Sequence, residues 1–184
     1  VPFQVESLSA LSDRERIYQY VTSENVISDH PWVVSLSNQQ LTAGGKVDQS
    51  ILNQLSGNVH PMILKLEGTR ISDAGLQQVC QYLKIVGLGL ELCQNVSDHG
   101  LQHLQNAKHL RVLVLAGVGI TERGLEKIVR AKSLVALDAE FCSGVTDLSC
   151  ESLGMMTQLR ALRLGKTGFE PVRITHAGLK QLAG

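Results

Sequence analysis

Two patterns of apolar and polar positions alternate along most of this chain. The first is Val/Ile–Ser/Thr–acid–x–Gly–Leu, which begins at residues 71, 96 and 120 and returns with changes at 145 and 174. The second, Leu-x-x-Leu-x-Leu, begins nine residues after the leucine of the first, for instance at Leu110 and Leu134. Its period of two predicts a short strand, and the Ser/Thr–acid pair supplies the N-cap and first-turn charge of a helix. Each unit is therefore predicted to be strand, turn and helix.

The spacing of 24 to 29 residues between copies of the motif predicts the architecture. A unit of this length cannot bury its apolar face alone, so successive units stack and share one elongated core. We expect an α/β solenoid with five repeats over residues 59–184. Its parallel β-sheet is expected to form a concave face, and its helices a convex face.

Residues 1–58 are predicted to form an N-terminal cap, because the terminal units of such arrays differ from the rest. A capping-box pattern predicts a helix over residues 12–21, Val34 and Leu36 predict a strand, and residues 47–52 align with a degenerate copy of the motif. No comparable cap follows the last repeat. Homo-oligomerisation through that repeat is therefore an open alternative.

The units resemble leucine-rich repeats of the cysteine-containing subtype, in which a Cys precedes Val/Ile-Thr-Asp and then Gly-Leu-x-x-Leu. Residues 93–98 and 142–147 are similar to this pattern, whereas residues 69–73 and 117–121 are one residue shorter and resemble its bacterial variant. The resemblance implies a horseshoe that binds other proteins. It also implies an alternative, a substrate-recruiting adaptor of a ubiquitin ligase or a bacterial effector that imitates one, and residues 8–32 resemble an F-box.

The strand positions between the leucines are predicted to point away from the core, onto the concave surface. Read in columns, they place small apolar residues in the centre and charged residues around them, as many protein interfaces do. Glutamate at Val112 and Val114 is expected to abolish partner capture without changing stability. The predicted function is non-catalytic binding of a protein through Lys65, Glu67, Glu91, Val112, Val114, Asp138, Glu140, Phe141, Arg163 and Lys166. A loop inserted at residues 168–172 is a candidate protrusion.

The composition limits the choice of partner. Seventeen basic residues balance seventeen acidic ones, so no net positive field favours a nucleic acid, and no apolar run is long enough to span a membrane. Cys93 and Cys142 occupy equivalent repeat positions, where a small buried thiol fits. This favours reduced cysteines and a cytoplasmic, reducing compartment, which for an effector is the host cytosol. No cofactor is expected.

Two arrangements offer an enzymatic alternative, a hydrolytic or metal-dependent enzyme. His99 and His103 lie four residues apart on a predicted helix, a spacing that can hold a metal, but no acidic ligand stands beside them at helical spacing. Asp138 and Glu140 form a carboxylate pair on one strand without a neighbouring nucleophile. The sequence therefore predicts no catalytic residue and no metal site.

Overall fold

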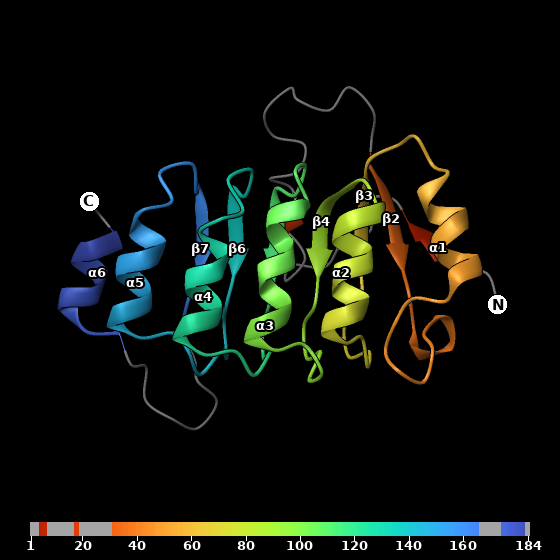
Figure 1. Cartoon of the computed structure of the whole chain (residues 1–184). Coiled ribbons are helices and arrows are strands. Elements are labelled where there is room, and N and C mark those ends of the chain that lie inside the picture. Colours follow the sequence, from red (N-terminus) through yellow and green to blue (C-terminus); the bar gives the residue numbers. More distant parts are fainter. Residues whose placement is uncertain (1–3, 7–16, 19–30, 166–173, 183–184) are drawn as a thin grey trace.

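A computed structural model describes residues 4–6, 17–18, 31–165 and 174–182 of the 184-residue chain as one sheet and one layer of helices (Figure 1). The elements are, in chain order, β1 Gln4–Glu6, β2 Trp32–Ser35, η3 Asn38–Gln40, α1 Gln49–Ser56, β3 Met62–Lys65, α2 Asp73–Tyr82, β4 Ile85–Gly89, α3 Asp98–Leu101, η4 Gln102–Asn106, β5 Val112–Val114, α4 Glu122–Ile128, β6 Ala136–Asp138, α5 Asp147–Gly154, β7 Ala161–Arg163 and α6 His176–Leu182.

The sheet runs in sequence order from β1 to β7. Strands β2 to β7 are parallel, and β1 pairs antiparallel with β2. Figure 1 shows α1 to α6 side by side on one face of the sheet. The opposite face is called the far face below. The predicted α/β class and parallel sheet are therefore confirmed.

Apolar side chains fill the space between the sheet and the helices. Leu64, Leu88, Leu113 and Leu137 stand in register on neighbouring strands, and all four belong to one continuous buried core. The alternating strand positions form the predicted columns, with one column running from Lys65 through Gly89, Val114 and Asp138 to Arg163. The pattern of period two thus predicted the side of the sheet on which each of these residues lies.

An acidic side chain in the first turn of one helix holds the start of the next helix. Asp73 accepts two hydrogen bonds from Ser97, one from its backbone N–H at 2.8 Å and one from its hydroxyl at 2.6 Å. Asp147 accepts the same pair from Thr175, at 2.7 and 2.6 Å, and these bonds lower the pKa of Asp147. The equivalent donor to Asp98 is Thr121. This set of Asp73, Asp98 and Asp147 is called the carboxylate ladder.

The carboxylate ladder explains the glycine of the motif. In each case, a Cβ at the glycine of the following helix would collide with the carboxylate oxygen that reaches it: Gly100 with Asp73, Gly124 with Asp98, and Gly178 with Asp147. Only a residue without a side chain leaves room for the carboxylate beside the helix backbone. The acid and the glycine are therefore two halves of one contact between neighbouring units.

The contact between the third and fourth units differs from the others in both halves. Glu122 stands at the position held by Asp73, Asp98 and Asp147 in three other units, and its longer side chain accepts a hydrogen bond from the Thr146 hydroxyl. Ser149 then replaces the glycine, and its hydroxyl accepts a hydrogen bond from the Thr146 backbone N–H at 2.9 Å. A longer acid thus leaves space for a side chain on the next helix.

The N-terminal region is described only in part. Most of the helix predicted over residues 12–21 and the inserted loop at 168–172 lie outside the described residues. Strand β2 and helix α1 lie where the sequence predicts a strand and a degenerate repeat, and the Asp48 side chain caps α1 by accepting from Ser50 N at 2.9 Å. Strand β2 pairs with β3, so the sheet continues across the predicted boundary at residue 58.

Gly124→Ala should destabilise the fold by about 2 kcal/mol, because the new methyl group displaces the Asp98 carboxylate from Thr121. In an Asp98→Ala background the same change should be neutral or stabilising, since alanine is a better helix former than glycine by about 1 kcal/mol. Urea unfolding followed by circular dichroism measures both free energies. Gly119→Ala, where a Cβ would meet nothing within 4 Å, is the control. An equal cost of Gly124→Ala in both backgrounds would contradict the ladder.

Candidate functional site

The apolar centre predicted for the concave surface is buried. Val112 is 0% exposed and Val114 is 7% exposed, and both pack in a hydrophobic cluster that includes Ile17 and Tyr18. Glutamate at either valine would bury an unpaired charge, so the expectation that these substitutions leave stability unchanged is wrong. The accessible part of the predicted site therefore lies along the ends of the strands.

Each of four strands is followed by a turn whose third residue has positive φ. The turns are closed by backbone hydrogen bonds from residues 69, 93, 118 and 142 to the carbonyl three residues before. The third residues are Gly68, Leu92, Gly117 and Phe141, with φ of 67°, 58°, 71° and 59°. Glycine adopts this left-handed conformation freely, whereas a leucine or phenylalanine there costs about 1–2 kcal/mol.

Leu92 and Phe141 are exposed as well as strained. They are 55% and 40% exposed, and among the described residues no other non-glycine residue has positive φ. A Cβ on Gly117 would lie 2.7 Å from Leu92 Cδ2, so the Leu92 side chain extends across Gly117. In the backbone hydrogen bonds that join neighbouring turns, Gly117 lies between Leu92 and Phe141. Leu92, Gly117 and Phe141 are called the turn strip. It is an apolar surface at the carboxyl ends of β4, β5 and β6.

Three carboxylates border the turn strip. Glu67, Glu91 and Glu140 stand one residue before Gly68, Leu92 and Phe141 on their respective turns. Glu67 is exposed, and Glu91 and Glu140 are half-buried. The structure thus brings together four residues of the predicted site (Glu67, Glu91, Glu140 and Phe141) and adds Leu92. Lys65 is half-buried at the end of β3, and Lys166 lies outside the described residues.

Arg163 binds two carboxylates next to Phe141. Its guanidinium lies 3.4 Å from Asp138 Oδ2 and donates to Glu140 Oε2 at 3.1 Å. Asp138 is fully buried, and its second oxygen accepts from the Glu140 backbone N–H at 3.0 Å. The predicted carboxylate pair therefore compensates one arginine and fixes the backbone that leads into the turn at Phe141.

Arg163→Met should destabilise the protein by about 2 kcal/mol, because it leaves the buried Asp138 carboxylate without its counter-charge. This figure is below that of a fully buried pair because the arginine side chain is 39% exposed. Adding Asp138→Asn should recover much of the loss, since the neutral amide still accepts from Glu140 N. Chemical unfolding of the two single variants and the double variant tests this, and strictly additive free energies would contradict it.

The four cysteines are free and buried. The thiols of Cys93 and Cys142 donate to the carbonyls of Leu66 and Leu115 at 3.0 and 3.1 Å. Burial raises the pKa of Cys80 and of Cys142 to about 12. These groups therefore stay protonated at neutral pH and are poor nucleophiles, since the reactive species is the thiolate.

The raised thiol pKa values predict a pH dependence of stability. In the unfolded chain the thiols ionise near their ordinary pKa of 9.0, whereas folding holds Cys80 and Cys142 protonated up to about 12. Their contribution is complete below pH 9 and declines as the pH rises toward 12, by up to about 1.4 kcal/mol per pH unit for each thiol. Urea midpoints at pH 8, 9 and 10 measure the decline. A Cys80→Ala/Cys142→Ala variant with the same pH slope as the parent would contradict it.

The two histidines lie on a helix that changes type between them. His99 is in α3, which ends at Leu101, and His103 is in the 3-10 segment η4. Their rings meet edge to face with centroids 6.2 Å apart. Within the described ranges, no group of three or more His, Cys, Asp or Glu side chains is arranged to hold a metal ion.

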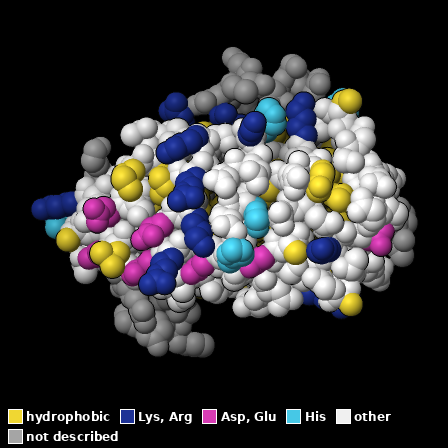
Figure 2. Space-filling model, viewed as in Figure 1, with side chains coloured by type: hydrophobic (Ala, Val, Ile, Leu, Met, Phe, Trp, Pro, Cys, Tyr) yellow, Lys and Arg dark blue, Asp and Glu magenta, His cyan; other side chains and the backbone are white. Residues whose placement is uncertain are grey.

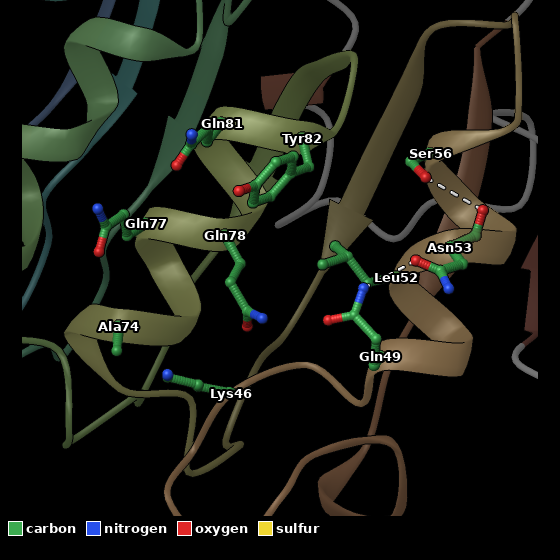
Figure 3. Close-up of a pocket in the computed structure, with 10 residues that line it drawn as sticks. All are labelled: Lys46, Gln49, Leu52, Asn53, Ser56, Ala74, Gln77, Gln78, Gln81 and Tyr82. Atoms are coloured by element: carbon green, nitrogen blue, oxygen red, sulfur yellow. Dashed lines mark hydrogen bonds between the residues drawn. The ribbon is translucent and has the colours of Figure 1, made fainter.

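A groove of about 480 Å³ separates α1 from α2 on the helical face (Figure 3). Amide side chains dominate its walls, and Tyr82, which is 55% exposed, lines one end. Two internal bonds orient these amides: Gln49 Nε2 donates to Asn53 Oδ1 at 2.8 Å, and Gln78 Oε1 accepts from Val47 N at 3.1 Å. Figure 2 shows this end of the helical face to be mostly uncharged, whereas charged side chains gather over the later helices. The groove thus offers neutral hydrogen-bonding groups, with Lys46 as the one cation among its described lining residues.

No family model matches this sequence, and no curated protein sequence is significantly similar to it. Among the helices of the described ranges, none combines the length and the apolar character that crossing a bilayer requires. The segment that resembles an F-box, residues 8–32, falls almost entirely outside the described residues.

Proposed function

We propose that the chain is a leucine-rich-repeat solenoid that binds another protein, without catalysis, at the ends of its concave strands. The observation that carries this proposal is the turn strip, where two large apolar side chains are exposed at positions that favour glycine. A reducing compartment agrees with the free, buried thiols.

Backbone strain and exposure together support a binding role for Leu92 and Phe141. An exposed apolar residue in a relaxed conformation needs no explanation. A leucine and a phenylalanine held in the left-handed region cost stability, while equivalent turns of the same sheet use Gly68 and Gly117. Strained residues of this kind cluster at functional sites, because the strain is retained only where the side chain is needed.

The surroundings of the turn strip indicate the chemistry of the partner. The apolar side chains of Leu92 and Phe141 suit an aliphatic or aromatic group. The neighbouring carboxylates of Glu67 and Glu91 suit a lysine or arginine that flanks this group. A protein segment that combines an apolar anchor with a basic residue fits both features. Because the chain as a whole has no net charge, the local negative charge of these carboxylates would determine the preference for a basic residue.

Replacing Leu92 and Phe141 by glycine should raise stability and abolish binding. Each change relieves a left-handed side chain, so we expect a gain of about 0.5–1 kcal/mol per site after the entropy of glycine is subtracted. The same changes remove the apolar anchors, so partners captured from a lysate and identified by mass spectrometry should fall at least tenfold. Opposite effects on the two measurements separate a binding role from a structural one.

The control is Leu148→Gln, which removes a 65% exposed leucine from α5 on the helical face. It should leave the captured set unchanged. Undiminished capture by the Leu92→Gly/Phe141→Gly variant would exclude the turn strip as the binding surface. A loss of stability in that variant would show that the two side chains serve the fold.

A further inference from the structure

The far face of the sheet carries a second hydrophobic cluster, separate from the core beneath the helices. Seven of its buried members lie in a strand or within two residues after one: Val33, Ile63, Val86, Val112, Val114, Ala116 and Ala136. None of these seven is more than 7% exposed. Within the described residues, Ile17 and Tyr18 are the members from outside the sheet, and they are 5% and 1% exposed.

Two glycines in β4 make room for Tyr18. A Cβ on Gly87 would lie 3.1 Å from Tyr18 Cδ1, and a Cβ on Gly89 would collide with the Tyr18 hydroxyl. The strands on either side carry Ile63 and Lys65, or Val112 and Val114, at the same register positions. Glycine within a strand costs stability and typically marks the close approach of another group. The missing side chains of β4 form a recess, which is called the glycine seat.

The glycine seat has a polar end. A Cβ on Gly89 would lie 2.6 Å from Glu67 Oε1, so the Glu67 carboxylate and the Tyr18 hydroxyl meet over the same residue. The seat therefore matches a tyrosine in shape, and the apolar cluster around it accommodates the aliphatic residue that precedes the tyrosine.

The glycine seat is continuous with the turn strip. Leu92 stands three residues after Gly89, in the turn that follows β4, so the two surfaces are at most about 10 Å apart along the chain. A single partner segment can therefore occupy both. A resident segment in the same chain has a high effective concentration, so an external segment competes well only when it gains contacts elsewhere.

We infer that the glycine seat is a binding site for an aliphatic–tyrosine segment, that Ile17–Tyr18 occupies it within the chain, and that the partner presents such a segment in its place. This inference rests on the proposed protein-binding function and adds the chemistry of the partner.

A labelled peptide with the sequence of residues 13–22 tests the seat directly by fluorescence anisotropy. The full chain carrying Ile17→Ser and Tyr18→Ser should bind it at least tenfold more tightly than the parent chain, whose seat is filled. A peptide with Ala in place of Tyr18 should not bind, because it leaves the recess over Gly87 and Gly89 empty. The chain with Ile17→Ser and Tyr18→Ser is called the vacated chain. Adding Gly89→Val to it should abolish binding, with circular dichroism confirming that this variant folds.

Equal binding by the parent and vacated chains, or binding that survives Gly89→Val, would overturn the inference. A dimer of the parent chain that requires Tyr18 would also overturn it, because the resident would then come from a second copy. If the vacated chain does not fold, Gly89→Ala in the parent replaces it. This change should expel Tyr18 and speed chymotryptic cleavage after Tyr18 at least tenfold, and unchanged cleavage would overturn the inference.

These outcomes are independent of the turn strip. Peptide binding to the glycine seat does not require Leu92 or Phe141, so the Leu92→Gly/Phe141→Gly variant tests the proposed function separately. If that variant loses capture and the vacated chain binds no peptide, the turn strip is supported as a binding surface and the glycine seat is excluded as one.

Discussion

The contact on which the stacking of units depends is the carboxylate ladder on the helical side. Each ladder aspartate accepts a backbone N–H and a hydroxyl from the start of the next helix, so it fixes both the distance and the rotation between neighbouring units. The same oxygen excludes a side chain from the following helix. Three letters of the repeated motif (the hydroxyl residue, the acid and the glycine) thus express one interaction. The Glu122–Ser149 exception follows the same steric logic with a longer acid.

Because the ladder and the buried leucines determine the stacking, the two faces of the sheet serve different purposes. The helical side holds the continuous core, so few other residue types fit at the repeated motif positions that face it. The far face and the turns carry residues that stacking does not require. There the chain retains features that cost stability: two glycines inside β4, two left-handed apolar residues and a buried aspartate that depends on Arg163. Departures of this kind are expected at functional or strained sites, which agrees with the proposed binding role.

Much of this structure could be predicted from the sequence, because the governing interactions are local and periodic. The strand columns and most helix starts follow from period-two leucines and from Ser/Thr–Asp caps. The covering of Val112 and Val114 could not be predicted, since it depends on Ile17 and Tyr18, which are nearly a hundred residues away and outside the repeat. Gly87 and Gly89 were the available indication, because a strand interior rarely carries two glycines without a reason. Leu92 could have been found by comparing its column with Gly68 and Gly117.

The same physical factors explain why the accessible part of the predicted site lies at the edge of the sheet and not at its centre. A flat apolar centre is covered at no loss by residues of the same chain, since burial of valine is favourable whichever segment provides it. A turn is covered less easily, because its backbone is fixed by the i to i+3 hydrogen bond. Leu92 and Phe141 therefore remain exposed while the valines behind them do not. Asp138, paired with Arg163, also accepts from the Glu140 backbone N–H that leads into the turn at Phe141. Under the proposed function, a surface held in this way would lose less entropy when a partner binds.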